Sequence, residues 1–317
     1  MAELVQAPML NANILFYLFF AGAGAGSYLL ASLVSLIVRF TRGERIHGYL
    51  PLASGGLIIG PALVLFGAVF LVADLGLPER AWLILLSPIP SILNIGAWLI
   101  VAFIALSAAL FAIRHLRGLH LPRALLTTLD VLSSLAASGI VLYTGVFLAG
   151  MPALPFLHSL ALVVLLAASA LSCGAAVITL YGFFCFSHKA MSYGLTAAPF
   201  IDLPLLTAEL LSLAALLATS AFGGTPTAQA SAWMLLSGEL AVPFWLGATV
   251  AGLVLPVILD LSDFFGHRPR RLAVGALLVL GGGLILRYCL LAAARPVDLL
   301  DVLQLPLLSY GSMISGF

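Results

Sequence analysis

The chain carries very little charge for its length. Of its 317 residues, 8% are Asp, Glu, Lys or Arg and 63% are hydrophobic, whereas a soluble domain has roughly 25% charged residues. So few charges could not cover a surface exposed to water, and the composition therefore predicts a protein that crosses a membrane several times. The net charge of +1 also lacks the basic excess typical of nucleic-acid binding, so we expect no nucleic-acid partner.

Metal-binding and haem-binding patterns are missing as well. The three cysteines lie far apart and form no C-x-x-C pair, and almost all of the histidines fall near helix ends or in loops on one side of the predicted bundle. A b-type haem commonly needs two facing histidines inside the helices, and clusters need grouped cysteines. We therefore expect no haem, no metal and no iron–sulfur cluster in this protein. These residues are Cys173, Cys185, Cys289, His47, His115, His120, His188 and His267, with His158 alone near the other side.

Long apolar runs are what the sequence has in abundance. About 20 apolar residues span the hydrocarbon core as a helix. Ten of the 13 Lys and Arg residues fall in alternate connections, after the first, third, fifth and seventh runs, and mark the cytoplasmic side by the positive-inside rule. We therefore predict an all-α integral membrane protein with eight transmembrane helices and both termini extracytoplasmic. The runs are roughly 13–38, 50–73, 91–113, 124–149, 156–184, 201–221, 240–260 and 272–294.

The two halves of the chain resemble each other weakly. "AGAGAGSYLL" in the first run is similar to "ALSCGAAVITL" in the fifth, and "GIVLYTG" in the fourth is similar to "GLILRYC" in the eighth. The offsets from Gly26 to Gly174 and from Gly139 to Gly283 are nearly equal. This pattern predicts two four-helix bundles related by an axis along the membrane normal, 1–150 and 151–295, followed by an apolar C-terminal tail at 296–317.

Several polar side chains lie at membrane depth, where an ionisable group costs on the order of 2.5–3.5 kcal/mol. The predicted orientation places most of them in the outer half of the membrane and Glu209 deeper. Each also has a simpler explanation: a carboxylate that reaches the headgroups, an interfacial tyrosine, a helix cap or a snorkelling arginine. Their grouping in one leaflet favours a common function. The outer residues are Asn13, Tyr17, Asp74, Tyr143, Glu239 and Arg287.

Tyrosines, carboxylates and an amide can hydrogen-bond a neutral, membrane-soluble molecule and accept its protons. A quinol fits this chemistry, because it carries two hydroxyl oxygens on an aromatic ring and releases two protons on oxidation. The sequence contains no nucleophile motif and no phosphate-binding loop that would favour another reaction.

The order of the motifs resembles the NrfD/PsrC-type membrane subunits of bacterial respiratory oxidoreductases, also called polysulfide-reductase membrane subunits. The resemblance covers nearly the whole sequence and is greatest for the NrfD-type subunit of nitrite reductase systems. The segments that carry it are "FYLFFAGAGAG", "GPALVLFGAVFLVADLGLPERAW", "SILNIGAW", "LYTGVFLAGMPALPF", "SALSCGAAV", "FWLGATVAGLVLPVIL" and "LILRYCLL".

This resemblance implies a cofactor-free subunit in the bacterial cytoplasmic (inner) membrane that binds menaquinol or another quinol near the outer leaflet. It would exchange electrons, in either direction, with a four-cluster ferredoxin-like iron–sulfur subunit and a terminal reductase of the multihaem cytochrome c or molybdopterin type. The implied quinone contacts are Asn13, Tyr17, Asp74 and Tyr143, with Asp74 and Tyr143 as the catalytic pair. The implied proton path contains Glu209, Arg287 and Glu239.

The resemblance does not fix which residue accepts the proton. His in place of Tyr17 or of Asp74 is compatible with the family pattern, so either position could differ in role from the corresponding position of a relative. The loop after Asp74, 75–90, would form part of the docking face for the electron acceptor.

Two other interpretations remain open at this point. A secondary transporter of a small solute would also have internal repeats and charges at membrane depth, but it would have no use for an iron–sulfur partner. A purely structural membrane anchor would not bring Asn13, Tyr17, Asp74 and Tyr143 together at one site.

Overall fold

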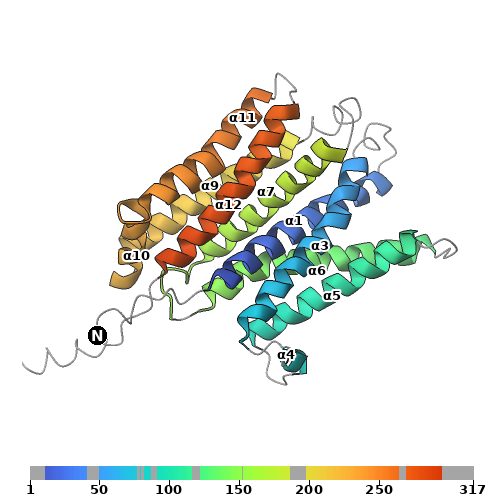
Figure 1. Ribbon diagram of the computed structural model, residues 1–317, viewed down its shortest axis with the longest axis horizontal. Coiled ribbons are helices and arrows are strands. Elements are labelled where there is room, and N and C mark those ends of the chain that lie inside the picture. Colours follow the sequence, from blue (N-terminus) through green and yellow to red (C-terminus); the bar gives the residue numbers. More distant parts are fainter. Residues whose placement is uncertain are drawn as a thin grey trace, which may run out of the picture.

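The computed structural model describes residues 11–40, 50–76, 79, 82–86, 91–115, 122–151, 153–185, 198–263 and 269–294. This part of the protein is helical and contains no strand. Eight of its helical segments are long and apolar enough to cross a membrane, as predicted (Figure 1). They are α1 (Ala12–Phe40), α3 (Leu50–Asp74), α5 (Ile92–His115), α6 (Arg123–Ala149), α7 (Leu160–Cys185), α9 (Ala198–Gly223), the continuous pair η3 (Pro243–Val254) and α11 (Leu255–Asp263), and α12 (Pro269–Ala293).

Two short helices were not predicted. α4 (Trp82–Leu86) lies in the connection between α3 and α5, and α10 (Pro226–Leu236) follows α9. α10 begins where the sequence has a helix start signal, because the Thr225 hydroxyl accepts a hydrogen bond from the backbone N–H of Ala228 and a proline follows it. Both helices are too short to span a bilayer, and α10 is too weakly amphipathic for its periodicity to reveal it.

The fifth and seventh spans differ from the prediction in detail. Residues 153–157 form turns around Pro155, so α7 begins at Leu160 rather than near 156. The seventh span is π-helical over Pro243–Val254, and the backbone N–H of Leu255 donates to the carbonyl of Val250. A π-helix differs from an α-helix in the spacing of its hydrogen bonds. This segment is apolar on all sides, so its sequence has no periodicity that would distinguish the two kinds of helix.

The helices pack around a central pair. α1 lies against α3, α6 and α7, while α7 also lies against α9 and α12. α12 in turn packs on the π-helical segment η3, and α5 packs mainly on α6 (Figure 1). α1 and α7 therefore connect the helices of the first half of the sequence to those of the second. The division into two four-helix bundles with an axis between them stays a prediction.

α1 and α7 cross at small residues. A Cβ atom on Gly26 would overlap the backbone of Ala170, and a Cβ atom on Gly174 would overlap the backbone of Gly26 and Ser27. The two glycines are the same pair that the weak sequence repeat relates to each other. Close backbone approach at small residues is a common way for membrane helices to associate.

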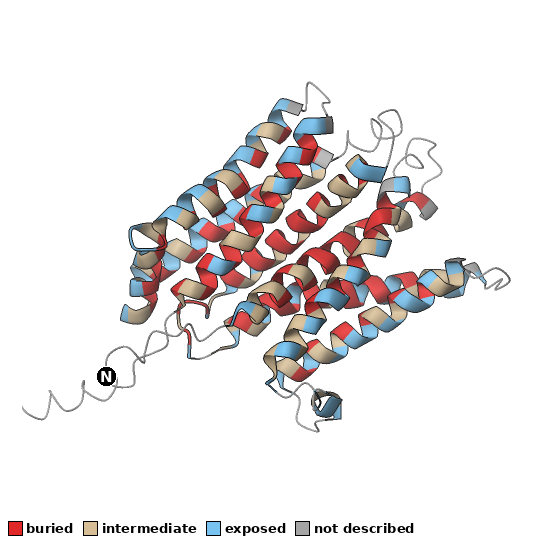
Figure 2. Ribbon diagram, in the orientation of Figure 1, coloured by how far each residue is buried: buried red, intermediate tan, exposed pale blue. Residues whose placement is uncertain are grey.

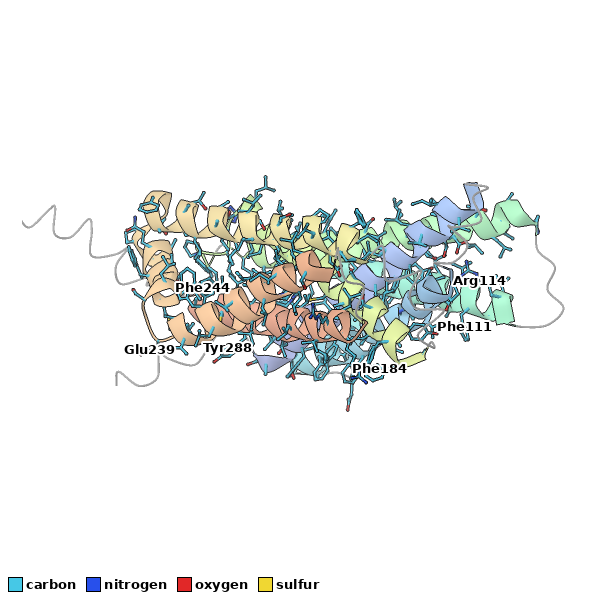
Figure 3. All side chains as sticks on the ribbon, turned by 90° about the horizontal axis from the view of Figure 1, so that it is seen from above. Phe111, Arg114, Phe184, Glu239, Phe244 and Tyr288 are labelled. Carbon is cyan, nitrogen blue, oxygen red and sulfur yellow. The ribbon has the colours of Figure 1, made fainter. Side chains whose placement is uncertain are left out.

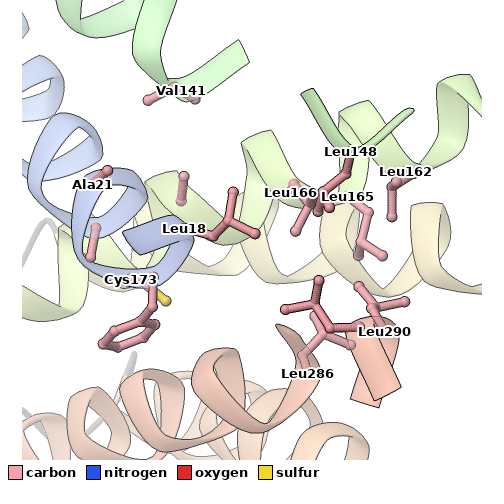
Figure 4. Packing of buried hydrophobic residues seen from close by; sticks show 14 of the residues in the cluster. Leu18, Ala21, Val141, Leu148, Leu162, Leu165, Leu166, Cys173, Leu286 and Leu290 are labelled. Atoms are coloured by element: carbon pink, nitrogen blue, oxygen red, sulfur yellow. The ribbon is translucent and has the colours of Figure 1, made fainter. Parts of the chain in front are cut away.

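Around this crossing, large apolar side chains from three helices fill the space. Leucines of α1, α7 and α12 belong to one buried cluster that also contains Cys173 (Figure 4). They include Leu18, Leu165, Leu166, Leu286 and Leu290.

Many of the residues exposed on the outside of the bundle (Figure 2) are large and apolar, as a lipid-facing surface requires. Large hydrophobic side chains such as Leu160, Phe184 and Phe222 are 77–86% exposed, whereas Arg287 and Glu209 are buried. A soluble protein would have this distribution reversed. In the described structure, the polar groups that matter for function therefore lie between helices.

The two ends of the bundle differ in charge. We call the end at which α1 begins and α3 ends the Asp74 end, and the opposite end, which holds Arg114, the basic end. Glu239 lies at the former and Arg114 at the latter (Figure 3). At the basic end Arg114 forms an ion pair with the buried Asp130.

Most of the basic connections predicted for this side fall outside the described residues, although Arg270 and Arg271 lie at the start of α12. The connections outside are 41–49, 116–121, 186–197 and 264–268; the tail 296–317 is outside too. The orientation of the protein in the membrane therefore stays a prediction.

Candidate functional site

Two tyrosines lie inside the bundle near the Asp74 end. Tyr17 on α1 is completely buried and Tyr143 on α6 is 5% exposed. Neither hydroxyl has a hydrogen-bond partner in the described structure. The two phenols are close enough to interact electrostatically. Tyr17 lies five residues after the start of α1 and Tyr143 six residues before the end of α6, and these two helices pack against each other.

Tyr143 is held against the neighbouring helix by a glycine. A Cβ atom on Gly96 of α5 would overlap the Tyr143 ring and its hydroxyl, so the ring lies directly on the backbone of α5. The Phe147 ring, one turn further along α6, lies with its centroid 5.8 Å from that of Tyr143. The phenol is therefore positioned by packing, and its enclosed hydroxyl has no hydrogen-bond partner in the described structure.

Asp74 lies nearer the end of the bundle. Its Oδ1 atom accepts a hydrogen bond of 3.0 Å from the side-chain amide of Asn11. Asn11 precedes Tyr17 by six residues, which corresponds to about 9 Å along a helix. Asp74 thus lies closer to its end of the bundle than the two phenols do. Asn13 is partly buried and lies between Asn11 and Tyr17 along α1. A carboxylate can accept several hydrogen bonds, so its contact with Asn11 leaves it able to accept a proton.

An aromatic cluster lies just below Asp74 on the same two helices. Phe16 and Phe20 of α1 contact Phe66 and Phe70 of α3, with centroid separations from 4.8 to 6.1 Å across the two helices. Phe66 is half exposed on the apolar surface. These rings, which meet tilted and edge to face as well as stacked, form an apolar wall on α1 and α3 that reaches the lipid-facing surface at Phe66.

A second polar group lies between α7, α9 and α12 in the second half of the sequence. The Ser172 hydroxyl of α7 donates to the Glu209 carboxylate at 2.8 Å, and the Arg287 guanidinium donates to the Ser169 hydroxyl of the same helix at 3.0 Å. Glu209 and Arg287 are 2% and 1% exposed. A carboxylate at this depth requires a cation or a proton, and Arg287 lies close enough to interact with Glu209, with serines of α7 between the two side chains.

The Arg287 side chain reaches the central helix pair. Nη1 also donates to the carbonyl of Gly283 at 3.0 Å, and the guanidinium carbon lies 5.7 Å from the centroid of the Phe19 ring. Nη2 faces Gly22 of α1, where a Cβ atom would lie 3.3 Å away. Nε and Nη2 have no partner in the described structure. Arg287 is therefore a buried cation with donors to spare, and it does not snorkel to the interface.

Glu239 stands apart from this group. It is exposed in the turn before η3, at the Asp74 end. The structure gives it no contact with Glu209 or Arg287, so its predicted place in a proton path stays a prediction.

Four buried or half-buried polar residues gave no functional signal in the sequence. Asp130, Asp260 and Asn94 are buried, and Asp202 is half-buried with one carboxylate oxygen enclosed. The three acids lie near the ends of predicted helices, where charged residues normally reach water, so their position did not distinguish them. Asn94 lies two residues from Gly96 at the start of α5, on the side of the bundle that also holds Tyr143.

No group of three or more His, Cys, Asp or Glu side chains among the described residues could hold a metal ion. The expected absence of haem, metal and iron–sulfur clusters stays a prediction.

Comparison with known proteins assigns the sequence to a family over nearly all of its length. The profile of the family described as polysulphide reductase, NrfD, matches residues 9–297. The C chain of polysulfide reductase from Wolinella succinogenes is 26% identical over 296 residues, which cover 88% of the present sequence and 92% of that protein. Protein NrfD of Escherichia coli is 28% identical over 314 residues, which cover 89% of the present sequence and 93% of that protein.

Proposed function

Because the protein belongs to the polysulphide reductase NrfD family of membrane subunits from respiratory oxidoreductase complexes, we propose that it binds a quinol near the outer leaflet and oxidises it. Menaquinol is the proposed quinol. The reverse reaction, quinone reduction, would use the same site.

The observation that carries this proposal is the pair of buried tyrosine hydroxyls without partners, Tyr17 and Tyr143. A buried polar group that lacks a hydrogen bond costs about 1–3 kcal/mol. Two such groups on adjacent helices near the same end of the bundle are explained by a ligand whose oxygen atoms accept hydrogen bonds from them. A quinone has two carbonyl oxygens, and it is apolar enough to enter from the lipid across the phenylalanine wall of α1 and α3.

Proton release would use Asp74. Oxidation of a quinol to a quinone yields two electrons and two protons. In this proposal the Tyr143 hydroxyl donates a hydrogen bond to one oxygen of the bound ring and orients it, and the Asp74 carboxylate accepts the two protons one after the other. The position of Asp74 at the end of the bundle allows each proton to pass to water before the next is accepted. Tyr17 and Asn13 hold the ring as further hydrogen-bonding groups.

The electrons would pass to partner subunits. We propose an extracytoplasmic iron–sulfur subunit of the four-cluster ferredoxin type and a terminal reductase with multihaem cytochrome c or molybdopterin centres. The relative from Wolinella is named as one chain of a polysulfide reductase, which supports an assembly of several subunits. The cytoplasmic membrane of a bacterium is the proposed location. The partner would dock at the Asp74 end, and the proposed docking segment 75–90 is largely outside the described residues.

Glu209, Ser172, Ser169 and Arg287 would form a route by which protons cross part of the second half of the protein. Support comes from the series of side chains between the two charges. Hydroxyl groups can both donate and accept, so each serine could pass a proton to its neighbour.

Turnover of the whole complex tests the proposal. Quinol oxidation would be measured in membranes that contain the complex with Tyr17→Phe, Tyr143→Phe or Asp74→Asn. Each tyrosine change should weaken the apparent quinol affinity roughly 2- to 10-fold, the equivalent of one neutral hydrogen bond, and Asp74→Asn should slow turnover. Tyr288→Phe is the matched control, because Tyr288 is 49% exposed on the lipid-facing side of α12. Equal activity of all four variants in an assembled complex would refute the site.

A further inference from the structure

A pocket separate from the tyrosine site lies at the Asp74 end of the second half. It has a volume of about 460 Å³ and lies between the turn that precedes α7 and the junction of α9 with α10. This volume is within the range of pockets that hold small ligands. Most of its polar lining groups are hydroxyls, and none of the described lining residues is acidic. The polar residues are His158, Ser159, Thr219, Ser220 and Thr225.

Two helices begin at this pocket. Ser159 precedes α7, and its hydroxyl accepts from the backbone N–H of Ala161. Thr225 caps α10 in the same way through Ala228. Both cap residues line the pocket. The N-terminus of a helix carries a partial positive charge, so the two helix ends together make this pocket favourable for an anion.

The side chain of Ser220 supplies the independent sign of a ligand. It lines the pocket, is 6% exposed and makes no hydrogen bond in the described structure. Its neighbour Thr219 satisfies its own hydroxyl by donating to the carbonyl of Ala215 at 2.8 Å. Ser220 therefore holds a nearly buried donor that a bound molecule could use.

His158 lines the pocket with a defined tautomer. Its Nδ1 atom lies 2.7 Å from the carbonyl oxygen of Ala149. Because a carbonyl only accepts, Nδ1 carries a proton. The imidazole is thereby oriented at the rim of the pocket, and Nε2 of this tautomer is an acceptor.

The rim of the pocket is lipid-facing. Phe222 and Leu160 adjoin the lining residues and are 86% and 78% exposed. Gly223 lines the pocket, and a Cβ atom on it would meet nothing within 4 Å. A pocket that favours an anion and lies next to exposed apolar side chains fits a molecule with a charged headgroup and hydrocarbon chains.

We propose that this pocket binds a phosphate group, and that its source is the headgroup of a phospholipid in the leaflet at the Asp74 end. The phosphate oxygens accept a hydrogen bond from Ser220 and lie near the N-termini of α7 and α10. The acyl chains extend over Phe222 and Leu160. The bound lipid would join the turn before α7 to the α9–α10 junction.

Lipid binding to the purified complex, with the full-length protein and its partner subunits, tests this proposal. After delipidation in detergent, the complex is titrated with dihexanoyl phosphatidylglycerol and the bound fraction is measured by native mass spectrometry. Ser220→Ala and Gly223→Leu should each weaken binding about tenfold, the first by removing a donor and the second by occupying the open space. Ser212→Ala and Gly281→Leu are the controls, because Ser212 lies about two turns deeper on α9 and Gly281 faces open space on α12.

Further titrations distinguish the sources of the phosphate. Inorganic phosphate should bind far more weakly than the lipid, and dihexanoylglycerol, which has no phosphate, should not compete. Equal binding of inorganic phosphate would overturn the lipid assignment, and full competition by dihexanoylglycerol would overturn the phosphate assignment.

A protein partner at this pocket is the remaining outcome. If Ser220→Ala and Gly223→Leu release a partner subunit and leave lipid binding unchanged, the pocket is a protein docking site and the proposal is wrong. Quinol binding should be unchanged in these variants, so the result is independent of the tyrosine site.

Discussion

The contact between Gly26 and Gly174 should control how the two central helices associate. A side chain at Gly26 would overlap the carbonyl group of Ala170, and one at Gly174 would overlap the backbone of Gly26 and Ser27. In both cases the obstacle is backbone, which cannot rotate away as a side chain could. A single Gly→Ala change therefore requires α1 and α7 to separate by about 1 Å, since carbon atoms pack at about 3.5–4.0 Å.

The magnitude follows from the packing that this separation disrupts. A gap of 0.5–1 Å removes about a quarter to a half of each dispersion contact, and Leu18, Leu165 and Leu166 pack beside the crossing. Overpacked cores lose about 1–3 kcal/mol, and we expect about 3 kcal/mol here for either Gly26→Ala or Gly174→Ala. The double variant should cost little more than one single variant, because the first separation makes room for the second Cβ atom.

Unfolding in mixed detergent micelles, followed by circular dichroism, would measure these free energies. Gly281→Ala is the control, because a Cβ atom on Gly281 meets nothing within 4 Å, and its effect should be near zero or stabilising. If Gly26→Ala and Gly174→Ala behave like Gly281→Ala, or if their effects add fully, the close crossing is wrong.

The remaining predictions concern buried charges. Arg114→Met should destabilise the protein by about 3 kcal/mol in detergent unfolding, because it leaves the buried Asp130 carboxylate without its cation. The double variant Arg114→Met/Asp130→Leu should recover most of that loss. No recovery would contradict the ion pair as the cause. Glu209→Gln should keep the hydrogen bond from Ser172 and change stability by less than about 1 kcal/mol, while proton movement by the complex in vesicles, measured with a pH-sensitive dye, should fall at least tenfold. Unchanged proton movement would remove Glu209 from the path. Arg287→Lys should keep the charge but lose the hydrogen bond to Ser169 or the one to Gly283. Thermal unfolding should show that the free energy of unfolding falls by about 1–2 kcal/mol. A variant as stable as the unchanged protein would contradict the geometry of this side chain.

Much of the fold could be predicted because the bilayer constrains it. The apolar runs indicated the eight spans to within a few residues at most ends, and they failed where turn geometry decides, at the start of α7. The π-helical segment could not be predicted, because Phe244, Gly247 and Gly252 are apolar or small and give no period. The wider turn of the π-helix occurs where the backbones of Gly252 and Gly282 approach closely. This contact between two helices is a tertiary effect that no local sequence pattern shows.

The sequence could predict those residues of the candidate site whose polar side chains are costly to place at membrane depth. Tyr17, Tyr143, Glu209 and Arg287 stood out as polar groups within apolar runs, and the structure buries all four. Their partners were not predictable, because serines such as Ser169 and Ser172 occur throughout membrane helices and commonly bond to their own backbone. The pocket beside Ser220 was also missed, because turns that precede and follow helices bring its residues together.

A quinol titration of the purified complex tests the assigned site most directly. A fluorescent quinol-site inhibitor would be bound to the complex of this protein with its iron–sulfur partner, and its fluorescence quenching would be compared among the unchanged protein, Tyr143→Phe, Asp74→Asn and the control Tyr288→Phe. We expect one saturable site that quinol competes for, weakened roughly 2- to 10-fold by Tyr143→Phe, weakened also by Asp74→Asn, and unchanged by Tyr288→Phe. Absence of saturable binding in the intact complex, or equal affinity in all of these variants, would contradict the assignment of a quinol site to these residues.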